Sequence, residues 1–460
     1  SLRPNFLILR TSSNKWSRLT TSMTCFACLL ASILASASST EVYVMMPLDE
    51  VTNRHTLKDR TGLGLALDKL REANVDGIML DVWWGLTEVS PRKYNFNASR
   101  IIVDMAKDRN LKVQLVTSFH QCGGNVGDIC DIKVPKFLHD HDIFYKDKWG
   151  NVNIEYVSLF ADHYVVMGRS VLHMYYDWFV AFAEEFADEL GTVITQVQVG
   201  MGPAGELRYP AYKFPFWEFC GIGAFQCYDP HALDSLRSAA FLAEHPGWAY
   251  PPQDVHSSEG YNTRPQDSIF FQEGYKSAYG KFFLDWYFSE LKRHAAEVLS
   301  RANAVFGGKV EIAGKVAGIH WWFKTPHHAA EVTAGYYNTN GRDAYAEITE
   351  VFATHNASID FTCLEMLDSD HDTACESGPE GLVKQVKLGA KSAGIAFNGE
   401  NALARYDDTA YKTIESYRNG MKDFTYLRLG PMLTEYDGNF DRFKAFVQRM
   451  HASESRLMWA

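Results

Sequence analysis

From residue 41 onward, the chain alternates between two hydrophobic patterns. Short runs that are apolar almost throughout, such as GIMLDVWW and KVQLVTSF, are typical of strands covered on both faces, as in a parallel sheet. Longer stretches between them place apolar residues at helical spacing. The pattern predicts strands over residues 42–48, 77–83, 112–119, 193–199, 310–316, 358–364, 394–397 and 423–429.

Helices are predicted between these strands, over residues 62–73, 99–107, 171–189, 275–303, 344–355 and 379–392. Eight strands that alternate with helices are the count of a single closed (β/α)8, or TIM, barrel. The extra length lies in long segments after the third and fourth strands, at about 121–170 and 200–268. Segments that follow the strands of such a barrel build its active-site face, so we expect these two to be functional.

The first forty residues differ from the rest. They contain four basic residues and no acidic one, and the apolar run CFACLLASILA leads into Ala35-Ser36-Ala37, a small-x-small sequence. This is the organisation of a secretory signal, and the acid-poor, Ser- and Thr-rich part also fits a plastid transit peptide. We expect residues 1–40 to be a cleaved targeting leader, for secretion or alternatively for the plastid, and residues 41–460 to be one catalytic domain.

Composition narrows the function classes. A formal net charge of −11 and a pI near 5.8 argue against a nucleic-acid partner. No other stretch reaches transmembrane length. Six cysteines follow the leader, without the paired Cys-x-x-Cys spacing of a zinc site, and the sequence leaves their pairing open. We therefore expect no metal and no cofactor.

Two glutamates have the placement that glycosidic chemistry requires. Glu206 and Glu400 follow the fourth and seventh predicted strands, nearly opposite one another in a barrel. One carboxyl group can protonate a departing oxygen while the other activates water. Opposite strands favour the wide carboxyl separation of inverting enzymes, about 6.5–9.5 Å, over the 5–5.5 Å of retaining ones. The alternative is that either glutamate only pairs with an arginine at the mouth of the barrel.

Eight segments resemble, in order, the successive motifs of the β-amylase family: VYVMMPL, GIMLDVWWG, SFHQCGGNVGD, GPAGELRYP, KVAGIHWW, FTCLEM, GENALARYD and FTYLRL. The resemblance covers residues 42–450. It implies a (β/α)8 hydrolase that removes β-maltose, with inversion, from the non-reducing ends of α-1,4-glucans such as starch and maltodextrin. We expect it to act as a monomer.

The resemblance also assigns residues. It implies that Glu206 is the catalytic acid and Glu400 the base. The positions that match the glucose-binding residues of the family are Asp81, His120, Asp128, Lys315, His320, Thr362, Asn401, Ala402 and Arg428. Of these, Asp81, His120 and Asp128 are expected to close one end of the site.

Further expectations concern the loops. The glycines of residues 123–127 predict a lid, or alternatively an ordinary tight turn. Thr362 is expected to hold Glu400 or its water, and Cys122 and Cys363 are expected to be reagent-sensitive thiols. Residues 129–131 and 216–225, and Ala404 where the family commonly has proline, depart from the family pattern.

Two rival functions stay open at this point. A β-amylase-like protein can be a catalytically idle glucan-binding regulator, and a barrel glycosidase can retain the anomeric configuration. The presence of the matched acid, base, lid segment and threonine favours an active enzyme over the regulator. The first anomer released distinguishes inversion from retention.

Overall fold

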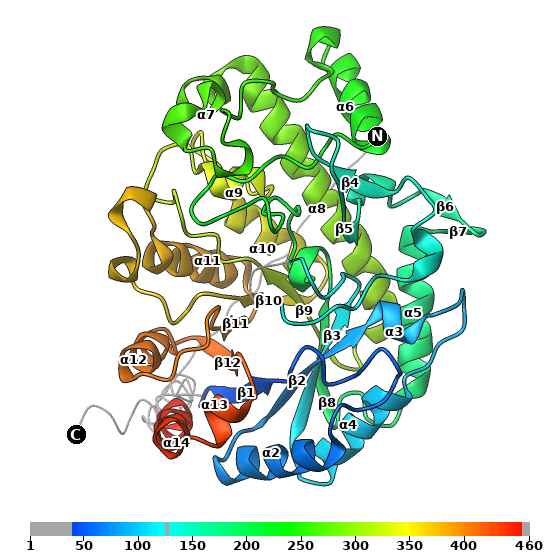
Figure 1. Cartoon of the computed structure of the whole chain (residues 1–460), viewed down its shortest axis with the longest axis vertical. Coiled ribbons are helices and arrows are strands. Elements are labelled where there is room, and N and C mark those ends of the chain that lie inside the picture. The colour runs from blue at the N-terminus through cyan, green and yellow to red at the C-terminus, as the bar shows by residue number, and fades with distance from the viewer. Residues whose placement is uncertain (1–38, 125–127, 453–460) are drawn as a thin grey trace, which may run out of the picture. The chain divides into compact units, whose positions relative to one another are not determined.

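A closed barrel of parallel strands forms the centre of the computed structural model, which describes residues 39–124 and 128–452 (Figure 1). The barrel order is β1-β12-β11-β10-β9-β8-β3-β2. The strands are β1 (Glu41–Met45), β2 (Gly77–Trp83), β3 (Lys112–Ser118), β8 (Ile194–Val199), β9 (Glu311–Val316), β10 (Ala357–Phe361), β11 (Phe397–Glu400) and β12 (Met421–Tyr426). The predicted TIM barrel is confirmed.

Helices lie between the strands, and several of them cover the outside of the barrel (Figure 1). They are α2 (Arg60–Glu72), α3 (Trp84–Thr87), α4 (Asn97–Lys107), α5 (Val171–Glu185), α6 (Pro230–Leu242), α7 (Ile269–Gln272), α8 (Ala278–Phe306), α9 (Ala329–Thr333), α10 (Ala344–Thr354), α11 (Pro379–Ala393), α12 (Asp408–Ser416), α13 (Pro431–Thr434) and α14 (Asp437–His451). Several begin at a capping side chain, since the oxygens of Asp59, Ser170 and Ser277 accept hydrogen bonds from first-turn amides. None of the described helices is long and apolar enough to cross a membrane.

The two long insertions follow β3 and β8, as predicted. The first contains the hairpin of β4 (Phe144–Lys146) and β5 (Val152–Val157) and the short pair β6 (Val165–Val166) and β7 (Arg169–Ser170). The second contains α6 and α7. The insertions contact one another, because the Tyr228 amide donates to the Lys146 carbonyl over 3.0 Å. Together they build up the side of the barrel on which the strands end.

The predicted position of the seventh strand, residues 394–397, is wrong. The strand is β11, Phe397–Glu400, and Gly394 instead ends α11 at a φ of +73°. The sequence of β11, FNGE, lacks a hydrophobic pattern because Asn398 and Glu400 are buried among polar groups. Asn398, for example, donates to the Asp360 carboxylate over 2.8 Å. A strand whose side chains face a polar interior cannot be located from hydrophobicity.

The interior of the barrel is polar below the strand ends, whereas the apolar core lies mainly between strands and helices. Thr425 of β12 donates to Gln114 of β3 over 3.0 Å, which links two strands through the interior. Burial raises the pKa of Asp423 to about 6. A network of buried hydrogen bonds therefore supports the residues at the strand ends.

Candidate active site

A cavity of about 390 Å³ lies at the ends of the barrel strands. It is large enough for part of a sugar chain, and it collects side chains from most of the strands and from both insertions. Nine of the eleven predicted site residues line it: Asp81, His120, Asp128, Glu206, Lys315, His320, Thr362, Ala402 and Arg428. The remaining two, Glu400 and Asn401, are buried beside lining residues.

Glu206 is placed by a turn that begins where β8 ends. Gly200 lets this segment pass the end of β3, because a Cβ there would lie 2.2 Å from the Thr117 carbonyl oxygen. Gly205 has a φ of +74°, in the region that favours glycine. The chain then pairs with the end of β9, where the Leu207 amide donates to the Lys315 carbonyl over 2.8 Å. This pairing holds Glu206 at the cavity wall.

The Glu206 carboxylate has a cation beside it from its own segment. Arg208 Nε donates to Glu206 Oε2 over 2.7 Å, and the Glu206 side chain is 12% exposed. Burial by itself lowers the pKa of Arg208, but Glu206 and Glu155 outweigh it and raise the pKa above its ordinary value. Arg208 is therefore charged. The pairing agrees in part with the alternative in which Glu206 only pairs with an arginine at the mouth of the barrel. Both residues, however, line a cavity.

Glu400 is the last residue of β11 and lies deeper. Lys315 Nζ donates to Glu400 Oε2 over 2.6 Å, and only 2% of the Glu400 side chain is exposed. The other oxygen, Oε1, is buried and accepts no hydrogen bond from any residue that the structure describes. A buried carboxylate oxygen without a partner is an acceptor for a water or a sugar hydroxyl.

Lys315 acts electrostatically on both glutamates. Burial alone lowers the pKa of the ammonium group, but the carboxylates of Glu400 and Glu206 raise the pKa above its usual value. The ammonium group of Lys315 therefore carries the positive charge that faces the two carboxyl groups. Glu400 is the nearer of the two, since Lys315 donates to it directly.

Two histidines of the cavity are neutral. Burial lowers the pKa of His120 to about 3, and the nearby charges of Lys315 and Arg208 act in the same direction. Burial also lowers the pKa of His320 to about 3, assisted by His371. In both rings Nδ1 is buried and bonds to no described residue. Neutral imidazoles with an unused nitrogen suit hydrogen bonding to sugar hydroxyls.

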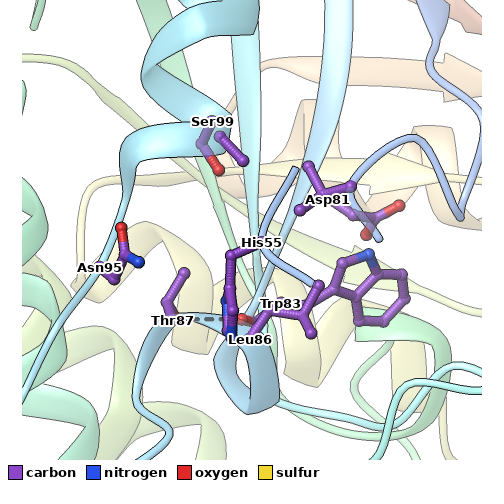
Figure 2. Close-up of a pocket in the computed structure, with 9 residues that line it drawn as sticks. His55, Asp81, Trp83, Leu86, Thr87, Asn95 and Ser99 are labelled. Atoms are coloured by element: carbon purple, nitrogen blue, oxygen red, sulfur yellow. Dashed lines mark hydrogen bonds between the residues drawn. The ribbon is translucent and has the colours of Figure 1, made fainter. Parts of the chain in front are cut away.

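Asp81 and Trp83 of β2 close one end of the cavity. Both also line a small second cavity behind it, so they form the wall between the two. Figure 2 shows their side chains on one side of this small cavity, and those of Asn95 and Ser99 on the other. Ser118 Oγ donates to Asp81 Oδ1 over 2.6 Å. Burial raises the pKa of Asp81, whereas Arg428 and Ser118 act to lower it.

Asn401 and Thr362, two of the predicted glucose-binding residues, make hydrogen bonds to the backbone of the protein itself. The Asn401 side chain donates to the carbonyls of Leu403 and Leu427 and accepts from the Leu427 amide over 2.8 Å, so it joins the ends of β11 and β12. Thr362 Oγ1 accepts a hydrogen bond from the Gly318 amide over 3.0 Å. No hydrogen bond between Thr362 and Glu400 is present among the described residues, and the expectation that Thr362 holds Glu400 or its water stays a prediction.

The cysteines of the site correct one expectation. Cys122 forms a disulfide with Cys130 and is not a thiol, so the prediction of a reagent-sensitive Cys122 is wrong. The sequence did not reveal the pair because the chain bends back between the two residues, which brings their Cα atoms to 5.6 Å. Cys220 pairs with Cys375 across 155 residues. Cys363 is a free thiol but fully buried, and burial raises its pKa well above its ordinary value.

The predicted lid lies only partly within the described residues. Gly123 and Gly124 have φ angles of +97° and +122°, which only glycine adopts readily. The Gly123 amide donates to Asp128 Oδ2 over 2.8 Å. Residues 125–127 lie outside the description, so the lid stays a prediction.

Several residues of the site were not predicted. Arg208 lies in the segment GPAGELRYP, and the local signal for it is a cation two residues after Glu206. Glu365 accepts hydrogen bonds from the Ala402 and Leu403 amides beyond Glu400. Phe219 and Trp217 form an aromatic side of the cavity together with Trp321, one of the paired tryptophans that alternation along the chain allows to face the site. No sequence signal distinguished Phe219 and Trp217 from core residues.

Metal coordination has no candidate in the described part of the chain, where no three or more His, Cys, Asp or Glu side chains form a group that could hold a metal ion. The chemistry available at the cavity is that of carboxyl groups, a lysine and neutral imidazoles. A TIM barrel with two glutamates at separate strand ends, around a polar and aromatic cavity, is the arrangement of a glycoside hydrolase.

Comparison with known proteins identifies the family. The chain matches glycosyl hydrolase family 14 over residues 43–455 and belongs to it. It is 45% identical to β-amylase 1, chloroplastic, of Oryza sativa over 436 residues, which cover 90% of this chain and 81% of the rice protein. It is 43% identical to a β-amylase of Vigna unguiculata over 437 residues, 90% of this chain and 87% of that protein.

A solved structure agrees. The catalytic domain of a β-amylase from Paenibacillus polymyxa superposes with a TM-score of 0.75 at 30% identity, covering 91% of this chain and all of the bacterial domain. The predicted family is thereby confirmed, and the chain is a glycoside hydrolase of the β-amylase type.

Proposed function

We propose that this enzyme hydrolyses α-1,4-glucosidic bonds of starch-like glucans and releases β-maltose from non-reducing ends, with Glu206 as general acid and Glu400 as general base. The observation that carries the proposal is the charge arrangement in the cavity. Lys315 lies 2.6 Å from the buried carboxylate of Glu400, and Glu206 lines the open cavity. Two carboxyl groups that meet at one cavity are the pair that glycoside hydrolysis requires, one as acid and one as base.

The proton balance follows from these positions. Glu400, which accepts a hydrogen bond from Lys315, removes a proton from a water that attacks the anomeric carbon. Glu206 gives its proton to the glycosidic oxygen as the bond to the anomeric carbon breaks. Because water enters from the face opposite to the departing chain, an α-linked glucose leaves as the β-anomer. The unpartnered Glu400 Oε1 provides an acceptor for that water.

The closed end of the cavity supports attack at chain ends. Asp81 and Trp83 form its wall, and His120 packs against Trp83 with ring centroids 5.0 Å apart. A pocket closed at one end admits a chain terminus and excludes the middle of a chain. Maltose is the product if two glucose units fit between this wall and the bond that is cut, as the resemblance to the family implies.

The test is to incubate the enzyme with soluble starch and to record proton NMR spectra of the anomeric region during the first minutes, with chromatography of the products. We expect β-maltose to appear first. Early α-anomer would contradict inversion, and a ladder of longer oligosaccharides would contradict exo-action. A lack of hydrolysis with retained maltodextrin binding would favour the idle regulator.

The location and oligomeric state are further proposals. The name of the rice relative, a chloroplastic β-amylase, supports the plastid alternative, and no comparison supports the secretory expectation. We expect residues 1–40 fused to a fluorescent protein to direct it to plastids. We also expect a monomer, which light scattering coupled to size exclusion would measure.

A further inference from the structure

Exposed aromatic side chains lie on the loop that borders the cavity and on the neighbouring turn between β4 and β5. Phe219 lines the cavity and is 48% exposed. Phe216, on the same loop, is 46% exposed, and Trp149, in the turn between β4 and β5, is 45% exposed. Large apolar side chains that gather on a surface next to a binding site indicate that the surface has a binding role. Phe216 and Trp149 are called the outer aromatic pair below.

The outer aromatic pair comes from both insertions and meets on one buried ring. Phe216 stacks on Tyr261 with centroids 6.0 Å apart and an interplanar angle of 25°. Trp149 stacks on the same ring at 5.4 Å and 30°. Tyr261 is fixed, because its hydroxyl donates to Asp147 Oδ2 over 2.8 Å. Both rings of the pair are therefore positioned by the same support.

The loop that carries Phe216 and Phe219 is held by three indole groups. Trp217 and Trp321 each donate Nε1–H to the Gly221 carbonyl, over 2.9 and 3.0 Å. Trp322 donates to the Cys220 carbonyl over 2.7 Å. A loop with its backbone fixed in this way loses little conformational freedom when a ligand binds.

The turn that carries Trp149 is equally well ordered. Asp147 Oδ1 accepts from the backbone amides of Trp149 and Asn151, each over 2.9 Å. The Lys213 ammonium group bridges the two segments, since it donates to the Val152 carbonyl over 2.7 Å and lies 5.4 Å from the centre of the Phe216 ring. The outer aromatic pair is a preformed surface rather than two independent side chains.

The structure assigns to the outer aromatic pair a binding site for glucose units of the same α-glucan, beyond the cavity on the leaving side. This inference rests on the proposed function. Because Asp81 and Trp83 close one end, the rest of a bound chain has to leave over the open rim, where Phe219 lies 5.9 Å from the His320 ring. The apolar C–H faces of glucose pack favourably on aromatic rings.

The test compares a short and a long substrate. Replacing both Trp149 and Phe216 with Ala should raise the KM for amylose by about 3- to 10-fold, as expected for loss of ring contacts that act on substrate and transition state alike. We expect maltotetraose, which has only four glucose units, to occupy the cavity without reaching the pair, so its kcat/KM should stay unchanged. The matched control is Phe241→Ala on α6, which removes a ring that is 75% exposed elsewhere.

A binding measurement separates this inference from the proposed function. In the Glu206→Gln background, isothermal titration with amylose and with maltose reports binding without turnover. The inference predicts weaker amylose binding and unchanged maltose binding when the pair is replaced, even if the parent enzyme does not release maltose. Equal effects on both substrates, or no effect on amylose in either assay, would overturn it and leave the pair as a surface for another partner.

Discussion

The two glutamates of the site are held by cations of different origin. Arg208, the partner of Glu206, lies two residues away on the same segment, and Glu206 is 12% exposed. Lys315, the partner of Glu400, comes from β9, 85 residues away in the chain, and Glu400 is 2% exposed. The first pair is set by local sequence, whereas the second exists only because the barrel closes.

This difference matches the different tasks of the proposed acid, which has to meet the substrate, and the proposed base, which has to keep its position. The Glu206–Arg208 pair lines the cavity, where the glycosidic oxygen would replace Arg208 as the partner of the proposed acid. A buried pair between strands keeps its geometry, because both partners belong to the barrel. The proposed acid therefore belongs to a pair at the cavity wall, and the proposed base belongs to a buried pair that two strands hold in place.

The largest expected effect is the loss of either carboxyl group. Glu206→Gln and Glu400→Gln should each lower kcat by about 10²- to 10⁴-fold, because glutamine keeps the shape but transfers no proton. Steady-state kinetics on maltotetraose measures this, with thermal unfolding to show that the variants fold. Glu244→Gln, at an exposed position after α6, is the control. A loss below tenfold in one variant would remove that residue from the pair.

Removing each cation should shift a different limb of the profile of kcat/KM against pH. Loss of a positive charge favours the protonated carboxyl group. Lys315→Met should therefore move the acid limb of the kcat/KM profile to higher pH, because the base must be ionised. Arg208→Met should move the alkaline limb to higher pH, because the acid must be protonated.

The Lys315→Met effect should be the larger of the two. It leaves a buried carboxylate without its partner, at a cost of about 3–5 kcal/mol in stability, and should lower kcat by about 10²-fold. Full pH–rate profiles of both variants check this. Shifts of the same limb in both variants would contradict the assignment of acid and base.

A smaller effect is expected for two residues that support the glutamates through hydrogen bonds to the backbone. Tyr336 donates to the Leu207 carbonyl over 2.8 Å, next to Glu206, and Glu365 accepts from the Ala402 amide beyond Glu400. Tyr336→Phe and Glu365→Gln should each lower the free energy of unfolding by about 1–3 kcal/mol, because buried groups lose partners. Urea unfolding measures this. If kcat falls as far as in the glutamine variants of Glu206 and Glu400, Tyr336 and Glu365 take part in the reaction and do not only hold the backbone near the two glutamates.

The smallest effect is expected for thiol reagents. Cys122 is in a disulfide, and Cys363 is buried with a raised pKa, so little reactive thiolate is present. Iodoacetamide should change activity by less than about twofold in the oxidised enzyme. Treatment with dithiothreitol before alkylation makes Cys122 available and is the comparison. Rapid inactivation without reductant would contradict the prediction, because it would show that Cys122 or Cys363 is accessible as a reactive thiol.

The sequence by itself determined the order of strands and helices, and through motif order it located both glutamates. Glu206 lies in a segment whose glycines meet local requirements, such as the positive φ of Gly205. Helix starts are equally local, since a cap such as Asp59 bonds within three residues. Short-range hydrogen bonds and the hydrophobic period depend only on nearby residues, so they can be read along the chain.

The tertiary structure alone decided which partners these residues meet. The hydrophobic pattern misplaced β11 because its polar side chains face a polar interior, and it gave no reason to join Cys122 to Cys130 or Lys315 to Glu400. It also did not show that Phe216 and Trp149 share Tyr261. Apart from the Cys122–Cys130 pair, which spans eight residues, these contacts join residues far apart in the chain, and only barrel closure and the docking of the two insertions bring them together.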